Sequence, residues 1–344
     1  MLVELQKISR RMGERFDLVQ AGGGNTSFKD EKGKLHVKIS GIRLSDVKNE
    51  THFAILDNFK LLELFEHTNW AQLTKKEREI KASQIVKECN LTVERKPSIE
   101  TLLHSICPDV VLHAHPICIL KSFSSKENID KFQEEFAFVS YSTPGIELTL
   151  ELNQSRKNFI EQYKREPESI VLLNHGIVVY DKTPDLAFKK LLNSVNLIYT
   201  KLNLLQDEAY SLCNFISDQL ESILNEPKVT IFAGKVKNLE VEFSPFFPDA
   251  VVFLGAGPLK TSVDTFQKDL EIYISQYKIV PKVFLIEESV YISANTFAKA
   301  REIQEVWELQ REILERPLSK IEFLSESEIH YLSHWEAEKY RLEV

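Results

Sequence analysis

The chain has 344 residues, of which 43% are hydrophobic and 27% charged, a composition ordinary for a globular protein. No apolar run reaches the roughly 18 residues that a membrane helix needs, which excludes a helical membrane span. The formal charge of -8 and the sequence pI near 5.7, without a long basic stripe, argue against nucleic acid as a partner. A chain of this length is expected to form two domains.

The cysteine pattern indicates the redox environment. The four cysteines form no CxxC pair and no regular framework, so we expect neither disulfides nor a cysteine-rich zinc site. Cys118 lies three residues after His115 and could join a metal, but a small buried hydrophobic side chain is the simpler interpretation. The pattern favours a reducing, cytoplasmic location.

The first third of the chain begins with apolar residues at helical spacing, which predict an amphipathic helix over residues 2–16 rather than a signal peptide. Next comes "AGGGNTS", residues 21–27, whose consecutive glycines permit turns in which backbone amides bind anions. Residues 26–40 predict a hairpin that turns near Gly33. The charged run 74–88 is typical of a solvated helix or loop.

The middle of the chain continues this mixture of helices and strands. Pro97 precedes a predicted helix over 98–107 that begins at Ser98. This helix is followed by strand 110–116 and by 169–180, a strand with a turn at its centre. A capping threonine and a proline predict a long amphipathic helix over 183–205.

The last third predicts a second, smaller α/β unit. Segments 247–259 and 281–289 are interpreted as strands, and 289–314 as a strand followed by a long helix. The "GAG" at 255–257 lacks a third glycine and is followed by Pro258, so a turn at a strand end is favoured over a dinucleotide site.

Two histidines in an apolar strand are the first candidates for chemistry. His113 and His115 are two residues apart, so both side chains face the same side of the strand. His175 lies at a turn beside Gly176, which would let the backbone bend. Three histidine ligands leave a coordination position open, the pattern of a catalytic zinc site. Glu100 opens the preceding helix and could act as a general acid and base, or simply stabilise the helix N-terminus.

The motifs GGGNTS, SG, PSIE, HAH and NHG occur in the order that is typical of the class II aldolase/adducin family, whose best-known members are fuculose- and rhamnulose-phosphate aldolases. This resemblance covers residues 5–210. It implies a three-layer α/β/α domain with a central, mainly antiparallel sheet, and a second, smaller α/β domain follows. We therefore expect a catalytic domain over 1–212 and an extension over 228–344, similar to that of longer relatives.

The resemblance also implies the site and its chemistry. His113, His115 and His175 would hold zinc or another divalent cation, and Glu100 would be the catalytic acid and base. The positions that match the family's phosphate-binding residues are Gly24, Asn25, Ser40, Gly41 and Ser98. Two positions depart from the usual motifs: Ile99 stands where a serine is common, and Ser40 where the sugar aldolases often have threonine.

The expected function is that of a zinc-dependent lyase that cleaves or forms a carbon–carbon bond in a phosphorylated keto-sugar through a metal-stabilised enediolate. Epimerisation or dehydration of a sugar phosphate on the same metal site is an alternative, and a non-catalytic adducin-like interaction module is another. The expected partners are a small sugar or sugar phosphate and further copies of the chain, a tetramer by the resemblance.

Overall fold

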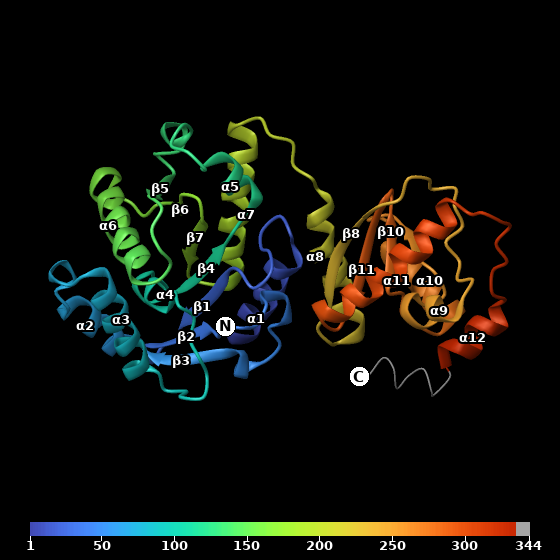
Figure 1. Ribbon diagram of the computed structural model, residues 1–344, viewed down its shortest axis with the longest axis horizontal. Coiled ribbons are helices and arrows are strands. Elements are labelled where there is room, and N and C mark those ends of the chain that lie inside the picture. The colour runs from blue at the N-terminus through green and yellow to red at the C-terminus, as the bar shows by residue number, and fades with distance from the viewer. Residues whose placement is uncertain (335–344) are drawn as a thin grey trace. The chain divides into compact units, whose positions relative to one another are not determined.

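The computed structural model describes residues 1–334 and divides the chain into two compact units, Met1–Gln206 and a second unit that begins at Asp207 (Figure 1). Residues 207–212, which the sequence assigned to the first domain, therefore lie in the second unit. The reason is that α8 (Ala209–Leu224) packs on the second unit's own sheet. Residues 335–344 of the expected extension lie outside the described residues.

The first unit is built around one sheet. Within residues 1–334 this sheet has seven strands in the order β3-β2-β1-β4-β7-β6-β5. Its neighbouring strands are antiparallel except for β5 and β6, so the prediction of a mainly antiparallel sheet is confirmed. The strands are β1 (Asn25–Lys29), β2 (Lys34–Lys38), β3 (Phe53–Asp57), β4 (Val110–Ala114), β5 (Phe136–Val139), β6 (Ser169–Leu172) and β7 (Gly176–Asp181).

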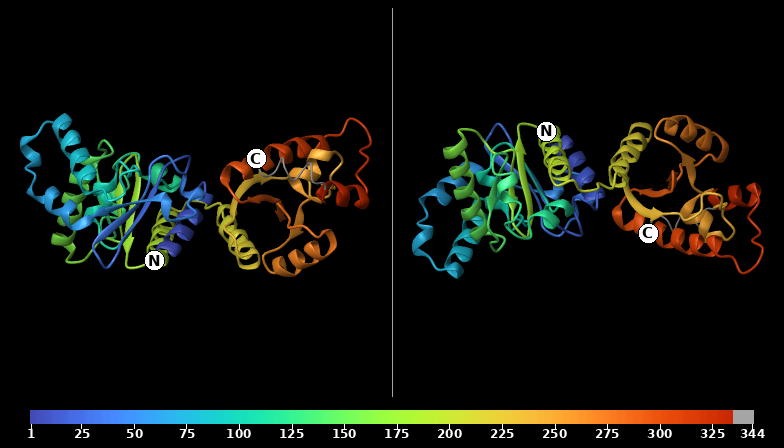
Figure 2. Two further views of the ribbon diagram at one scale, coloured as in Figure 1. Left: turned by 90° about the horizontal axis from the view of Figure 1, so that it is seen from below. Right: turned by 90° about the horizontal axis from the view of Figure 1, so that it is seen from above.

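Helices cover both faces of this sheet, as the predicted three-layer arrangement requires (Figures 1 and 2). One face carries α1 (Leu2–Glu14), α5 (Ile117–Ser122) and α7 (Pro184–Lys201). The other carries α2 (Asn58–His67), α3 (Lys75–Cys89), α4 (Thr101–Ile106) and α6 (Ile146–Tyr163). Short 3-10 helices lie at η1 (Leu44–Asp46), η2 (Glu50–His52), η3 (Trp70–Gln72) and η4 (Ile129–Lys131).

The central strand β4 sets the direction of the candidate ligands. Leu112 and Ala114 pack into the core beneath α1, α5 and α7, whereas Val111 packs with α4 and α6 on the opposite face. Because side chains alternate along a strand, His113 points to the same face as Val111. The apolar residues on both sides of His113 therefore hold its side chain toward α4.

The second unit repeats the layered plan on a smaller scale (Figure 2). In its described part, four strands lie in the order β8-β11-β10-β9, with α8 and α10 on one face and α9 and α11 on the other. The further elements are β8 (Val229–Lys235), α9 (Pro248–Leu254), β9 (Leu259–Thr261), α10 (Phe266–Tyr277), β10 (Val283–Ile286), β11 (Ser289–Ala294), α11 (Phe297–Glu315) and α12 (Glu326–His334). Among residues 1–334, no helix combines the length and the apolar character needed to cross a bilayer.

The interpretation of 247–259 as a strand was wrong. Pro248 begins the helix α9, and Gly255, with a φ of 81°, ends it. The apolar run is buried on several sides, with Ala250 and Leu254 in one core and Val251 in the other. A short run buried all round has no period that distinguishes a helix from a strand. The "GAG" turn therefore follows a helix and leads into β9.

Candidate active site

His113 is fixed in position and in tautomer by the centre of the first sheet. It is fully buried, and its Nδ1 lies 3.0 Å from the carbonyl oxygen of Ile177 on the neighbouring strand β7. A carbonyl only accepts, so Nδ1 carries the proton and donates it. The other ring nitrogen, Nε2, then presents a lone pair toward α4. Metal-binding histidines are commonly oriented in this way, by a hydrogen bond from the ring nitrogen that does not bind the metal.

His115 and His175 reach the same point from two different turns. His115 follows the end of β4, and its backbone N–H donates to the carbonyl of Leu18 at 2.9 Å. His175 lies in the short turn between β6 and β7, where Asn174 takes the left-handed conformation with a φ of 57°. Since β7 pairs with β4, this turn lies beside the end of β4.

Together the three imidazoles form a cluster suited to a cation. One candidate ligand atom from each of His113, His115 and His175 lies within 4.8 Å of the others, and the two Nε2 atoms of His113 and His115 are 3.0 Å apart. Burial lowers the pKa of His113 and His175 to about 4 and that of His115 to about 3. The rings are therefore neutral near pH 7, as metal ligation requires. Three imidazoles are a donor set that can hold a divalent metal ion and still leave a coordination position open.

Glu100 lies directly against this cluster. It is the residue before the first turn of α4, is 8% exposed, and places Oε1 3.6 Å from Nε2 of both His113 and His175. Burial raises the pKa of its carboxyl, and the nearby His175, His115 and Lys38 oppose that shift. A carboxyl with a raised pKa is a better general acid at neutral pH.

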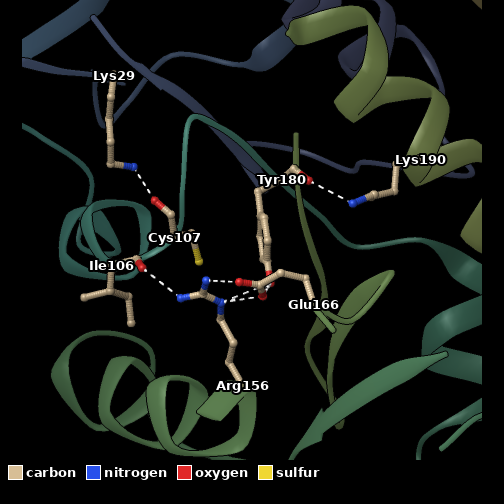
Figure 3. Close-up of polar contacts among 7 residues, drawn as sticks. All are labelled: Lys29, Ile106, Cys107, Arg156, Glu166, Tyr180 and Lys190. Atoms are coloured by element: carbon tan, nitrogen blue, oxygen red, sulfur yellow. Dashed lines mark hydrogen bonds and ion pairs between the residues drawn. The ribbon is translucent and has the colours of Figure 1, made fainter. Parts of the chain in front are cut away.

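The opposite end of α4 is held by two cations (Figure 3). The ammonium of Lys29 donates to the backbone carbonyls of His104, at 2.8 Å, and Cys107. Arg156 on α6 reaches the carbonyl of Ile106 at 3.5 Å and also bonds to Glu166 and to the hydroxyl of Tyr180. Cations at a helix C-terminus satisfy its last carbonyls. The helix that carries Glu100 is thus tied to β1, α6 and β7.

Two glycines allow the close packing around His115. A Cβ on Gly176 would lie 2.2 Å from the carbonyl oxygen of Ala114, and one on Gly23 would lie 2.7 Å from Nδ1 of His115. Gly176 does not have a positive φ, so the predicted bend is made by Asn174 instead. Gly176 is needed because the backbone of β4 passes so close.

The predicted phosphate-binding residues fall into two places. Asn25 pairs directly with His113 across β1 and β4, and Gly24 precedes it with a φ of 72°. Ser40 donates through its hydroxyl to the carbonyl of Pro97 at 3.1 Å, which brings Ser40 and Gly41 beside Ser98. Within residues 1–334, no hydrogen bond joins Asn25 to Ser40 or Ser98.

Two buried polar residues beside the cluster were not assigned to it from the sequence. Lys38 is 3% exposed, donates to the carbonyls of Ile39 and Ile42, and has its pKa lowered to about 8 by burial, with Glu100 opposing the shift. The sequence offered one sign of this role: Lys38 shares a strand face with His36 and lies two residues before Ser40, a predicted phosphate-binding residue. His104 is fully buried and its Nδ1 lies 2.7 Å from the hydroxyl of Ser27. It supports α4 rather than joining the cluster.

Several solved structures are similar to part of this chain. Among solved structures, the N-terminal class II aldolase domain of a conserved protein from Thermoplasma acidophilum is 26% identical, with a TM-score of 0.48, and the match covers 58% of this chain and 92% of that one. An L-fuculose 1-phosphate aldolase is 18% identical, with coverages of 61% and 93% and a TM-score of 0.40. A sugar-phosphate aldolase from Thermotoga maritima is 15% identical, with a TM-score of 0.41, and the match covers 60% of this chain and 96% of that one.

No curated protein sequence matches the chain. The sequence profile of the family described as "Class II Aldolase and Adducin N-terminal domain" does match, over residues 3–202. This range contains every strand of the first sheet, the three histidines and Glu100. The chain therefore belongs to the class II aldolase and adducin family.

Proposed function

We propose that this protein is a zinc-dependent aldehyde-lyase that cleaves or forms a carbon–carbon bond in a phosphorylated keto-sugar. The observation that carries the proposal is the convergence of three neutral histidines with a buried carboxyl 3.6 Å from two of them. Membership of the class II aldolase and adducin family supports it. An interaction module without catalysis would have no need to bury a carboxyl beside three imidazoles, at a cost in stability.

The proposed metal ligands are His113, His115 and His175. A divalent cation held there would supply Lewis-acid stabilisation of negative charge on the substrate oxygens. The chain's own contribution is to keep the rings neutral by burial and to hold His113 in one tautomer through Ile177. Both properties raise affinity for a cation.

Glu100 is the proposed general acid and base. When the carbon–carbon bond breaks, the carbon that keeps the electron pair must gain a proton, and the hydroxyl on the other carbon must lose its proton as that carbon becomes the aldehyde. In the direction of synthesis both proton transfers are reversed. The raised pKa of Glu100 allows it to give a proton at Oε1 and then take it back. Its low exposure keeps bulk water from competing for that proton.

The proposed phosphate-binding residues are Gly24, Asn25, Ser40, Gly41 and Ser98. The hydroxyl of Ser98 accepts from the backbone N–H of Glu100 at 3.2 Å, so its own proton can be donated to a phosphate. This bond also links substrate binding to the residue proposed to move the proton. We further propose that the chain assembles as a homo-oligomer, which sedimentation of the purified protein would test.

The test combines metal analysis with product trapping. The purified protein is expected to hold one zinc per chain and to release an aldehyde from a ketose 1-phosphate such as L-fuculose 1-phosphate. The His113→Ala variant is expected to lose both the metal and the turnover. Full turnover in metal-free protein would contradict the proposal.

The products distinguish the alternative reactions. An altered sugar phosphate without released aldehyde would indicate epimerisation or dehydration at the same residues. Absence of both metal and turnover would indicate an interaction module instead.

A further inference from the structure

A cavity lies wholly within the second unit, at the end of its sheet. It has a volume of about 540 Å³ and is formed where β11 ends and α11 begins, beside the start of β10 and the end of α8. A cavity of this size can hold a small-molecule ligand. None of the motifs that point to aldolase chemistry lies in this part of the chain, so the cavity calls for a separate explanation.

The charges on its walls favour an anion. Lys228, Lys282 and Lys299 line the cavity, against one carboxylate, Glu302, which is paired with Lys299 at 2.8 Å. Lys228 is paired with Glu226 at 3.0 Å. Lys282 makes no ion pair within residues 1–334.

Among the lysines that line the cavity, Lys282 is therefore the one without a carboxylate partner in the described part of the chain. Its ammonium donates to the carbonyl of Val252 at 2.6 Å, which occupies one of its three protons. Burial and, to a smaller extent, the charge of Lys299 lower the pKa of this amine to about 8. A bound anion would relieve both effects, because it stabilises the charged form.

The N-terminus of α11 adds a second positive element. This helix is 19 residues long, and the hydroxyl of Thr296 caps it by accepting from the backbone N–H of Lys299 at 3.2 Å. Thr296 and Ala298 both line the cavity. The first turn of a long helix carries a partial positive charge and is a common phosphate site.

Ser293 provides the independent sign of a ligand. It lines the cavity and is 5% exposed, yet its hydroxyl has no hydrogen-bond partner among the described residues. Tyr291, two residues earlier on β11, packs with α8 and α10. Because side chains two residues apart share a face of a strand, Ser293 points to the same side as Leu220 of α8, which also lines the cavity. A buried hydroxyl without a partner is costly and rare unless something else bonds to it.

We propose that this cavity binds the phosphoryl group of a small phosphate ester through Lys282, Ser293 and the N-terminus of α11. The ammonium would neutralise the phosphate, and the hydroxyl and the helix end would donate hydrogen bonds to its oxygens. The apolar side chains of Leu220, Val280 and Pro281 would contact the remainder of the ester. The site is separate from the proposed catalytic cluster, which lies in the first unit.

The test is calorimetric titration of the full-length protein with inorganic phosphate at constant ionic strength. Ser293→Ala and Lys282→Gln are each expected to weaken one phosphate-binding event by about tenfold or more, since each removes a hydrogen bond to a charged group. Ser98→Ala, in the first unit, is expected to leave that event unchanged. Phosphate binding that neither Ser293→Ala nor Lys282→Gln alters would overturn the proposal, as would equally strong binding of acetate.

A matched serine separates ligand binding from a structural role. Ser217 is also fully buried in the second unit, but its hydroxyl donates to Thr230 at 2.7 Å. Ser217→Ala is expected to lower the melting temperature without changing the phosphate affinity. Ser293→Ala is expected to keep or raise the melting temperature in phosphate-free buffer, because the removed hydroxyl has no partner, and to reduce the stabilisation that phosphate gives. The opposite pattern in the two variants would show that Ser293 is structural. If Lys282→Gln does not fold, the test rests on Ser293→Ala.

Discussion

The carboxyl of Glu100 and the three imidazoles beside it respond to burial in opposite ways. Burial disfavours the charged form of each group, so it raises the pKa of the acid and lowers the pKa of the bases. The result is a neutral set of potential ligands next to a carboxyl with a raised pKa. These shifts lead to two predictions for single residues.

The first prediction concerns Glu100→Gln. This change keeps the shape of the side chain but removes the group proposed to transfer the proton, so we expect kcat to fall by about 10²- to 10⁴-fold. The zinc content should stay at the proposed one per chain, because the proposed ligands are untouched. Steady-state kinetics with metal analysis of the same sample would check both. Glu88→Gln, which affects an exposed ion pair with Lys60, is the control and should leave both unchanged.

The second prediction concerns the stability of metal-free protein. In the folded protein the histidines of the cluster have pKa values of about 3 to 4, whereas the ordinary pKa of histidine is 6.5. Between these two pH values the unfolded chain therefore binds more protons than the folded protein. The free energy of unfolding should therefore fall as the pH is lowered below about 6.5, by up to about 1.4 kcal/mol per pH unit for each ring.

Glu100 contributes in the opposite direction, because its raised pKa makes the folded state bind the proton more readily. His115→Gln should thus make the loss of stability on acidification less steep, and Glu100→Gln should make it steeper. Urea unfolding in the presence of a chelator, between pH 5 and 7, would measure the slopes. Identical slopes for wild type and His115→Gln would contradict the burial argument.

At the scale of elements, the cluster depends on how one turn and two strands approach each other. The glycine turn before β1 passes over the ring of His115, and the hairpin of β6 and β7 brings His175 to the end of β4. The positions of the rings are therefore sensitive to single atoms on neighbouring backbone segments.

Adjacent glycines in that turn provide a matched pair for the third prediction. A Cβ on Gly22 meets nothing within 4 Å, whereas one on Gly23 would lie 2.7 Å from Nδ1 of His115 and must displace the ring. Gly23→Ala should lower zinc affinity by about 10- to 100-fold, the range for residues that orient a metal ligand, and Gly22→Ala should leave it unchanged. Competition with a chromophoric chelator would measure both. Equal affinities would show that the turn yields without disturbing the ring.

At the scale of the whole molecule, the chain consists of two units with separate hydrophobic cores. The segment between α7 and α8 carries Leu204, which is 38% exposed, and Leu205, which is 99% exposed. An exposed segment without regular structure is the preferred place for proteolysis.

This arrangement leads to the fourth prediction. Brief chymotrypsin digestion should cut first after Leu204 or Leu205 and yield two resistant fragments, with zinc retained by the N-terminal one. Mass spectrometry of the fragments would locate the cut. A first cut within residues 213–227, the interval left between the domains expected from the sequence, would contradict the division between Gln206 and Asp207.

The sequence by itself determined which residues could do chemistry and the kind of fold that holds them. Alternation along one strand is a local property, so it was enough to direct His113 to one face. His115, expected in the same strand, lies just after the end of β4 and reaches the cluster from the segment that follows. The order of the motifs was enough to indicate the family and the mainly antiparallel sheet. The apolar run at 250–254 was misread because a segment buried on several sides has no local periodicity.

Only the tertiary structure decided which of those residues meet. His175 reaches the other histidines because β7 pairs with β4, and Glu100 reaches them because α4 packs over that face. The buried Lys38, the clearance at Gly23 and the unpartnered hydroxyl of Ser293 also depend on contacts between distant segments. Distances and burial are properties of packing, which residue type and spacing along the chain do not specify.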